Sequence, residues 1–437
     1  MNLRFVVAAL VVCATSLASA QSQPTIILHC GHVLDVHTGK VLADQNIVIS
    51  GDRIRTIGPA ATTPAPAGAK LIDLTNATVL PGLIDAHTHL IGDDKSFDEA
   101  EPLKKSAAQM AYEAIPHARS TLLAGFTTVR DVGTYRAFVD VALRDAIDAG
   151  IVPGPRMDPA GAYVTISGGA GDVTGFAEDI DVPRTLRYGV ADSPDQVRQR
   201  VRLIIRHGAG VIKILATGAV LTLSSQPGAQ EMTYDEMRVA VEEASKAGLK
   251  VACHAHGAAG AKDAIRAGVA SIEHGSFLDE EALQMMKQRG TYLVPDMYDD
   301  TVIMQQPPGY PNSFIQKERA AGQSQIKVVK RALQLGVKIA FGTDAGVYPH
   351  GDNGRQFAVY VQNGMTPVYA IQTATVNAAD LLGWSDRVGS LDAGKFADIV
   401  AVRDNPLDNI RTLEHVAFVM KGGQVYKNDF AVSGTPK

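Results

Sequence analysis

The sequence has few cysteines and no excess of either sign of charge, and both facts exclude particular kinds of protein. Cysteine is scarce, at three in 437 residues, which excludes a disulfide-stapled scaffold. Cys30 and Cys253 are expected to be buried free thiols, because Cys253 lies in an apolar run beside histidines. Neither sign of charge dominates, since 41 Lys and Arg stand against 46 Asp and Glu, so no basic excess points to nucleic acid. A hydrophobic share of 46% and a charged share of 20% exclude a disordered or collagen-like chain and predict a large core with a small-molecule partner.

Long apolar runs are also missing, apart from one at the start of the chain. Residues 1–20 begin with the basic MNLR, continue with the apolar FVVAALVVCATSLA and end in a small-x-small site. This order is typical of a cleavable secretory signal peptide, whose apolar part is too short to span a bilayer. We therefore expect an exported protein, periplasmic or secreted, without a membrane span. A buried first helix is the alternative.

The two ends of the chain share one sequence pattern, short strand-like runs separated by turn residues. Residues 21–81 contain the strand-like runs TIILHCGHVLDV, NIVISGDRIRTIG and KLIDLTNATVL, separated by Gly, Asp and Pro. The same pattern returns in residues 386–437, in ADIVAVRDN, HVAFVMKGG and QVYKN. We expect the two ends to build one small β-sandwich domain together.

Residues 82–385 have a different sequence pattern, in which eight strand-like runs alternate with helical stretches. The runs are LIDAHTHL, TTVRDVG, RMDPAGAY, VIKILATG, KVACHAHG, ASIEHGS, TYLVPDM and KIAFGTDA. Stretches such as SPDQVRQRVRLIIRHGA, TYDEMRVAVEEASKAG and SQIKVVKRALQLG carry apolar residues three and four apart and contain or end at Gly. Eight such units predict an α/β fold, a (β/α)8 TIM-like barrel with its chemistry at the carboxyl ends of the strands.

Metal-ligating side chains fall at the ends of the expected strands. Residues two apart in a strand point to one face, so His-Thr-His presents two imidazoles side by side, as a metal chelate requires. A surface pair or a hydrogen-bonded core pair of histidines would show the same spacing. The full set, all at one end of the barrel, favours a metal site. It comprises His87, His89, Lys213, His254, His256, His274 and Asp344.

Lys213 is the unusual member, because an ammonium group is repelled by divalent cations and cannot ligate them. A buried lysine loses its proton readily when it is desolvated, and the neutral amine can add carbon dioxide to form a carbamate. The two carbamate oxygens can bridge two metal ions about 3.5–4 Å apart. Pairing of Lys213 with an acidic residue inside the barrel is the alternative.

The motifs LPGLIDAHTHL, VIKILATG, HAHG, SIEHG and FGTDAG together resemble the amidohydrolase superfamily, in its imidazolonepropionase-like branch with a carboxylated lysine. GTDAGVYPHGDNGRQF and VGSLDAGKFADIVAV are similar in order and spacing to Xaa-Pro dipeptidase-like, carboxypeptidase-like and ochratoxinase-type members. The resemblance spans nearly the whole mature chain. It implies two divalent metal ions, usually zinc, one held by His87, His89 and Asp344, the other by His254 and His274, with carboxylated Lys213, derived from CO2, between them.

The resemblance also implies an activity, the hydrolysis of the amide bond of small N-acyl amino acids or dipeptides, including ochratoxin-type amides. A metal-bridging hydroxide would attack the carbonyl, and Asp344 would shuttle the proton to the departing amine. One alternative is a cyclic amide or lactone hydrolase or a deaminase of the same superfamily, against which Lys213 argues. Another is a non-catalytic periplasmic binding protein, against which Asp344 argues. A homo-oligomer is expected, with an octamer as one candidate assembly.

Substrate contacts are expected from polar side chains near the strand ends. Arg130 suits a substrate carboxylate, whereas pairing with Asp131 is an equal alternative. The Gly-rich loop GAYVTISGGAGDVTGF has Ala170 where the family often has a histidine, which leaves substrate specificity open, and simple flexibility is the other interpretation of this loop. The candidate substrate-binding residues are Arg130, Tyr163, His256, His350, Asn353 and Arg355.

Overall fold

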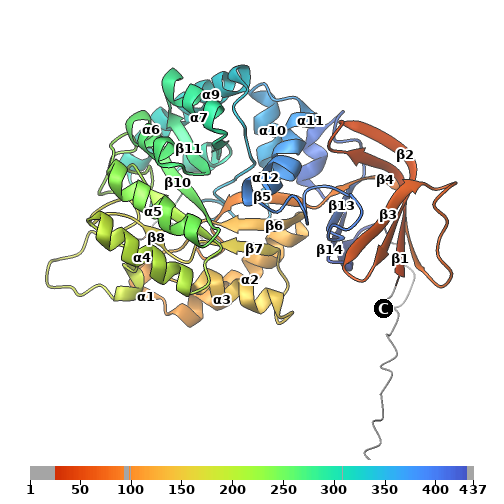
Figure 1. Ribbon diagram of the computed structural model, residues 1–437, viewed down its shortest axis with the longest axis horizontal. Helices are drawn as coiled ribbons and strands as arrows, with labels where there is room; N and C mark the ends of the chain where they lie inside the picture. Colours follow the sequence, from red (N-terminus) through yellow and green to blue (C-terminus); the bar gives the residue numbers. More distant parts are fainter. Residues whose placement is uncertain (1–24, 93–97, 99, 308, 431–437) are drawn as a thin grey trace, which may run out of the picture.

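The computed structural model describes residues 25–92, 98, 100–307 and 309–430 (Figure 1). The expected signal peptide, residues 1–20, lies outside this part of the chain. Among the helices described, none combines the length and the apolar composition that crossing a bilayer requires. Cys30 and Cys253 are buried free thiols, which confirms the expectation from their sequence surroundings.

Both ends of the chain contribute to one seven-stranded sheet, with the strand order β15-β14-β13-β4-β1-β2-β3. Strand β4 pairs in parallel with β1 and antiparallel with β13, so it joins the two ends of the chain. These pairings join all seven strands in one hydrogen-bonded sheet, and the sandwich expected from the sequence stays a prediction. The strands are β1 (Thr25–Asp35), β2 (Lys40–Ser50), β3 (Arg53–Pro59), β4 (Lys70–Pro81), β13 (Ile399–Val402), β14 (Phe418–Lys421) and β15 (Gln424–Asn428).

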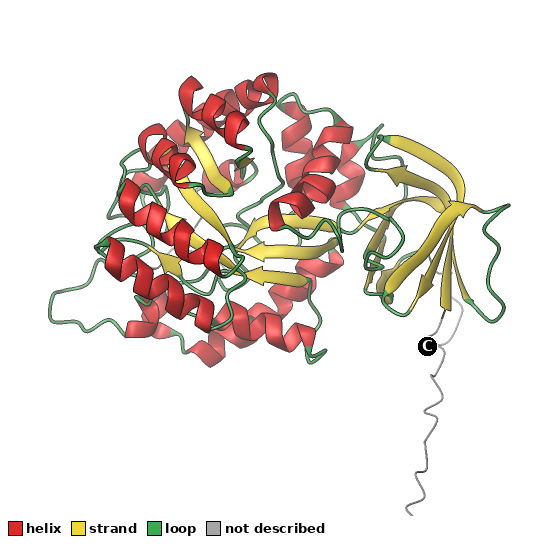
Figure 2. Ribbon diagram, in the orientation of Figure 1, coloured by secondary structure: helices red, strands yellow, loops and turns green. Residues whose placement is uncertain are grey.

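The middle of the chain forms two parallel sheets, one ordered β5-β6-β7 and the other β12-β11-β10-β9-β8. Helices lie on the outside of these strands, while the seven-stranded sheet lies at one end of the molecule (Figure 2). The α/β class expected from the sequence is thereby confirmed. The strands are β5 (Leu83–Thr88), β6 (Phe126–Asp131), β7 (Arg156–Pro159), β8 (Tyr163–Val164), β9 (Val211–Leu215), β10 (Lys250–Gly257), β11 (Ser271–Phe277) and β12 (Tyr292–Val294).

Most helices follow a strand, and their apolar sides face the parallel sheets. The α-helices are α1 (Glu101–Lys104), α2 (Ala107–Leu123), α3 (Val139–Asp148), α4 (Pro194–Arg206), α5 (Tyr234–Lys246), α6 (Ala258–Ala267), α7 (Glu280–Arg289), α8 (Asp299–Ile303), α9 (Asn312–Leu335), α10 (Arg355–Gln362), α11 (Pro367–Gln372) and α12 (Ala378–Leu382). Two short 3-10 helices, η1 (Arg184–Leu186) and η3 (Ile410–Glu414), and a π-helical turn, η2 (Thr373–Asn377), complete the described elements.

Helix α4 shows why these residues form a helix where the sequence predicts one. The Ser193 hydroxyl accepts a hydrogen bond from the Gln196 backbone amide, which satisfies one donor of the first turn. The side chains of Val197, Val201 and Ile204 are buried and lie on one face, as their spacing requires. Two of the three helical stretches predicted above start and stop close to their expected bounds, whereas α9 begins well before the periodic run and extends from Asn312.

Arg156 at the start of β7 attaches the seven-stranded sheet to the parallel strands. Its guanidinium donates two hydrogen bonds, of 2.8 and 3.2 Å, to the two carboxylate oxygens of Asp398. The same guanidinium lies 3.5 Å from the centre of the Phe396 ring. Asp398 is only 5% exposed and also accepts a 2.7 Å hydrogen bond from the Gly422 amide. A bidentate pair with one partner this deeply buried stabilises more than an exposed ion pair does.

Replacing Arg156 tests this attachment. We expect Arg156→Met to lower the free energy of unfolding by about 3 kcal/mol, because it leaves the Asp398 carboxylate buried without its cation. Denaturant unfolding measures the loss. Arg53→Met is the matched control, since Arg53 lies 3.6 Å from the same ring but its acid partner, Asp52, is half-exposed. Equal losses in both variants would show that stacking on Phe396, rather than the ion pair, holds the two parts together.

Candidate active site

A cavity of about 290 Å³ lies at the carboxyl ends of the parallel strands. Eight of the residues singled out from the sequence line it, and they come from β5 and the residue after it, from β8, β9, β10 and β11, and from the segment 339–345. The parallel arrangement therefore brings together side chains that are far apart in the chain. These eight are His87, His89, Tyr163, Lys213, His254, His256, His274 and Asp344.

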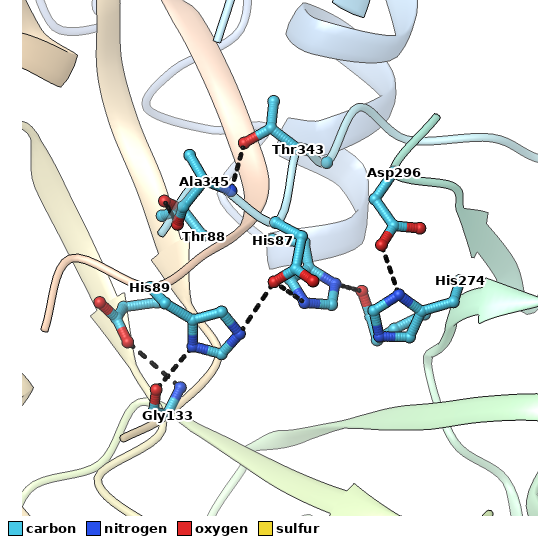
Figure 3. Close-up of polar contacts among 12 residues, drawn as sticks. His87, Thr88, His89, Gly133, His274, Asp296, Thr343 and Ala345 are labelled. Atoms are coloured by element: carbon cyan, nitrogen blue, oxygen red, sulfur yellow. Dashed lines mark hydrogen bonds and ion pairs between the residues drawn. The ribbon is translucent and has the colours of Figure 1, made fainter. Parts of the chain in front are cut away.

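His87 and His89 lie beside each other (Figure 3), and both rings approach Asp344. Their Nε2 atoms lie 3.3 and 3.2 Å from the same Asp344 oxygen, Oδ1. The opposite ring nitrogens are fixed, His87 Nδ1 at 2.9 Å from Glu273 and His89 Nδ1 at 2.7 Å from the Gly133 carbonyl oxygen. An acceptor on one nitrogen sets the tautomer and leaves the lone pair of the other nitrogen available to a metal.

A second group of imidazoles lies beside this pair. His254, His256 and His274 offer ring nitrogens within 4.8 Å of one another. His274 Nδ1 lies 2.5 Å from Asp296 Oδ2 (Figure 3). Burial, together with neighbouring His274, lowers the pKa of His254 well below its ordinary value and that of His256 to about 3. His254 and His256 are thus neutral bases, the form in which histidine ligates metals.

Lys213 lies on β9 with 2% of its surface exposed. Burial lowers the pKa of its ammonium group, against the opposing pull of Glu273 and Asp344. Within the described chain it forms no hydrogen bond and no ion pair, so the alternative that it pairs with an acid is not what the structure shows. A buried amine without a partner agrees with a neutral, reactive group.

The donor set fits a metal centre. His87 Nε2 is buried, and its contact in the described part of the chain is the 3.3 Å approach to Asp344 Oδ1, which lacks the geometry of a good hydrogen bond. His87, His274 and Asp344 offer ligand atoms within 4.8 Å of one another, which makes a second set of three beside the imidazole group. Although burial opposes its ionisation, Asp344 has a pKa held well below its ordinary value by His87 and His89, so it is a carboxylate. Imidazoles and a carboxylate are the ligands that zinc takes in catalytic sites, and a bound cation would displace the proton that, against the effect of burial, the neighbouring Asp344 carboxylate favours on His87, whose pKa is raised to about 9.

Two of these residues have strained backbones. His274 has a φ of 66° and Asp344 a φ of 53°, in the left-handed region that non-glycine residues seldom occupy. The Asp344 amide donates to the His87 carbonyl at 2.8 Å, and the Gln325 side chain donates to the His274 carbonyl at 3.0 Å. Such strain persists only where surrounding contacts hold it, and it gathers at functional sites.

Arg130 is not in the cavity, contrary to the expectation that it faces the substrate. Its guanidinium is 1% exposed and lies in the interior below the site. It donates to the Ala86 carbonyl at 2.6 Å, to the Ser271 hydroxyl at 3.0 Å and to the Glu273 carboxylate at 2.8 Å. The alternative pairing with Asp131 is also absent, because Asp131 accepts backbone hydrogen bonds instead.

Three further substrate candidates lie away from the cavity lining. Asn353 is fully buried and donates a 2.8 Å hydrogen bond to Asp85. His350 stacks on His117 with ring centres 4.7 Å apart. Arg355 begins α10 and pairs on the surface with Asp352 at 3.2 Å. The chain turns after the eighth predicted strand, so residues close to Asp344 in sequence point to other surroundings.

Sequence reasoning missed several residues that support or line the cavity. Glu273 precedes His274 and bridges Arg130 and His87, and its position beside a predicted ligand was the available signal. Asp296 is the last residue but one of the seventh predicted strand, TYLVPDM, so it also lay in a recognisable place. Asp299 and Glu318 belong to α8 and α9, in stretches without any motif, and only the fold brings them to the cavity.

The Gly-rich loop that carries Ala170 is held in place rather than simply flexible. The Ala170 amide donates to both carboxylate oxygens of Glu231, at 2.9 and 3.2 Å. Two residues on, Asp172 accepts hydrogen bonds of 2.7 and 2.8 Å from Arg187. Ala170 and Asp172 both line the cavity, so this loop forms part of its wall.

The placement of Arg130 gives a test that separates support from substrate binding. We expect Arg130→Met to lower the free energy of unfolding by about 3–5 kcal/mol, because it leaves buried Glu273 without its cation. Denaturant unfolding checks this. Arg355→Met is the control and should change stability by less than about 1 kcal/mol, since its ion pair is exposed. A stable Arg130→Met protein that has lost only its preference for substrates with a free carboxylate would restore the role expected from the sequence.

Known proteins resemble this chain along most of its length. The model of the amidohydrolase family matches residues 78–427. The ochratoxinase of Aspergillus niger is 32% identical over 443 residues, which cover 94% of this chain and 88% of that protein. A crystal structure of a Xaa-Pro dipeptidase with methionine bound in its active site superposes with a TM-score of 0.87, at 38% identity, and covers 92% of this chain and 100% of that one. The imidazolonepropionase of Pseudomonas fluorescens is 26% identical over 88% of this chain and 94% of its own. The motifs, the placement of their side chains and these matches together show that the chain belongs to the amidohydrolase family and is a hydrolase acting on C–N bonds.

Proposed function

We propose that this amidohydrolase is a binuclear metalloenzyme that cleaves the amide bond of small N-acyl amino acids or dipeptides. The observation that carries the proposal is the convergence of metal-ligating side chains and a buried lysine on one cavity. The relatives support the substrate class, because an ochratoxinase and a Xaa-Pro dipeptidase are among them.

Two divalent metal ions, with zinc as the first choice, would occupy this centre. When bound, such ions supply Lewis acidity and lower the pKa of a water molecule toward neutrality. Lys213 would carry the carbamate that joins the two positions, since its amine is buried, unpaired and close to both groups of ligands. The proposed holders are His87, His89 and Asp344 for one ion, and His254 and His274 for the other.

The proposal includes closure of the two parallel sheets into an eight-stranded barrel. Strands β7 and β8 are separated by residues 160–162 alone, and β7 pairs with β6 while β8 pairs with β9. The Gly210 amide donates to the Pro159 carbonyl at 2.8 Å, which supports treating residues 156–164 as one strand with two neighbours. On the other side, parallel bridges join Ile339 to Leu293 and Ala345 to Thr88, so residues 339–345 supply the eighth position.

Asp344 is placed to move the proton during hydrolysis. Its carboxylate is ionised, so it accepts a proton from the attacking water, and an amine leaves only after its nitrogen gains a proton. His256 lines the same cavity as a neutral imidazole, with Nδ1 fixed 3.0 Å from the Ser276 hydroxyl. That leaves its other ring nitrogen to hydrogen-bond the substrate.

A substrate panel tests the proposed activity. The zinc-loaded protein should release amine from N-acyl amino acids and dipeptides with kcat/KM at least tenfold above that for cyclic amides and lactones. Asp344→Asn should lower kcat about a hundredfold or more with a smaller change in KM, because it removes the base. Asp352→Asn, which removes an exposed carboxylate outside the cavity, is the control. Faster turnover of a cyclic amide or lactone would overturn the proposed substrate class.

Lys213→Ala tests the carbamate. We expect loss of one or both metal ions and of most activity, because the two cations would repel each other without the bridging anion. Metal analysis and kcat measure the effect, and excess acetate or propionate should restore part of the activity. Lys338→Ala, at an exposed lysine, is the control. Near wild-type metal content and rate in Lys213→Ala would rule out the carbamate.

A further inference from the structure

Three polar side chains that the proposed mechanism does not use form one buried network behind the cavity. Asp85 lies on β5 close to His87, Thr343 directly precedes Asp344, and Asn353 lies farther along the chain. Asp85, Thr343 and Asn353 are fully buried, and none of the three lines the cavity. They therefore do not meet the substrate, and any effect that they have on the reaction passes through residues that do.

The Asp85 carboxylate accepts hydrogen bonds from two separate parts of the chain. Its Oδ1 atom accepts from the backbone amides of His87, at 3.1 Å, and Thr343, at 3.2 Å. Its Oδ2 atom accepts from the Thr343 hydroxyl at 2.5 Å and from the Asn353 side-chain amide at 2.8 Å. A buried carboxylate is costly without such donors, so these contacts keep β5 and the segment 343–353 in one relative position.

The Thr343 hydroxyl uses its full hydrogen-bonding capacity. It donates to Asp85, and it accepts from the Ala345 backbone amide at 3.1 Å (Figure 3) and from the Asn353 side-chain amide at 3.4 Å. A hydroxyl has one proton to donate and two lone pairs, so every place is taken. The bond to Ala345 closes a side-chain turn around the residue between, which is Asp344.

This turn encloses a backbone conformation that Asp344 adopts only with support. Its φ of 53° lies in the left-handed region, where a non-glycine residue stays only if surrounding contacts hold it. The Thr343 and Asp344 amides both donate to the His87 carbonyl, at 3.0 and 2.8 Å. The Asp344 carboxylate lies 3.3 and 3.2 Å from the Nε2 atoms of His87 and His89. The direction of this carboxylate therefore depends on the turn that the Thr343 hydroxyl closes.

We propose that Thr343, held by Asp85 and Asn353, is a positioning residue for hydrolysis. Its hydroxyl fixes the backbone turn at Asp344, and the turn aims the Asp344 carboxylate into the cavity for proton transfer. This inference rests on the proposed function, in which Asp344 moves the proton. Thr343 acts only through Asp344, because its own side chain is enclosed by the network and does not line the cavity.

Two substitutions of Thr343 separate its hydroxyl from its shape. Thr343→Val keeps the branched shape without the hydroxyl, and Thr343→Ser keeps the hydroxyl. With zinc loaded and the fastest compound of the substrate panel, we expect Thr343→Val to lower kcat about ten- to hundredfold and to change KM less than about threefold, because a displaced base slows the chemical step and leaves binding intact. Thr343→Ser should keep kcat within about threefold of wild type.

Thr375→Val is the matched control for the loss of a buried hydroxyl. Thr375 is fully buried, and its hydroxyl donates at 2.8 Å to the Ile371 carbonyl, away from the cavity lining. We expect this variant to lose stability, as Thr343→Val does, but to keep the wild-type kcat. An equal fall in kcat in the two valine variants would overturn the positioning role.

A double substitution tests whether Thr343 acts through Asp344. Thr343→Val should lower kcat less than about threefold in an Asp344→Asn background, because the carboxylate that it positions is already gone. A full tenfold or larger fall in that background, flagged here as about the single-variant effect, would show that Thr343 acts elsewhere and would overturn the inference.

Crystal structures of the metal-free variants judge the inference without turnover. In Thr343→Val we expect Asp344 to leave its left-handed conformation or its carboxylate to move by about 1 Å or more, and in Thr343→Ser we expect neither change. An unmoved Asp344 in Thr343→Val would overturn the positioning role. If the wild-type protein cleaves no compound of the panel, the proposed function fails, while these structures still decide whether Thr343 positions Asp344.

Two further outcomes are decisive. Loss of zinc in Thr343→Val with a normal kcat per zinc-loaded molecule would assign Thr343 to metal retention alone and overturn the inference. If Thr343→Val does not fold, Asn353→Ala takes its place, since it removes a donor shared by Asp85 and Thr343. We expect it to lower kcat about three- to tenfold with KM little changed, and an unchanged kcat would count against the network.

Discussion

The site depends on the contacts that the Glu273 carboxylate makes with Arg130 and His87. The carboxylate is fully buried between a guanidinium on β6 and an imidazole on β5. Burial alone would raise the pKa of Glu273, but Arg130 and His87 hold it below its ordinary value, so the group is charged. A buried charge of this kind persists only with its partners in place. The three strands that carry these residues are therefore tied in one relative position, and His87, a ligand of the proposed metal centre, is oriented from below.

The parts of the fold that follow from local periodicity could be predicted from the sequence. The alternation of apolar runs with helical stretches predicted the parallel strands. The short strand-like runs at both ends of the chain predicted the sheet that the two ends share. Strand pairing could not be read in the same way. The run 46–58 contains the turn between β2 and β3, and the single sheet depends on β4 pairing with partners from both ends of the chain. Those pairings are long-range choices that no local pattern contains.

The same distinction holds for the candidate site: residues at the ends of expected strands could be predicted, and residues placed by tertiary packing could not. His87, His89 and Asp344 could be predicted because each falls at the end of an expected strand, His87 and His89 in the first and Asp344 in the eighth, and the structure brings them to one cavity. Arg130 also sits at a strand end, yet its long side chain reaches inward, toward a carboxylate that the sequence did not single out. Asp299 and Glu318 lie on helices, where an acidic residue usually faces water, and only tertiary packing makes them part of the cavity wall.

The shared sheet has a consequence for how the chain is made. A ribosome releases β1 to β4 first, and β13 to β15 only after all the parallel strands have been synthesised. Until then β4 presents an unpaired edge along residues 78–81, the stretch that β13 later covers. Open strand edges of this kind invite pairing with other chains. The sheet is therefore complete only after the C-terminal strands have been synthesised. A nascent chain that stalls before this point would expose the open edge of β4 to other nascent chains on the same polysome.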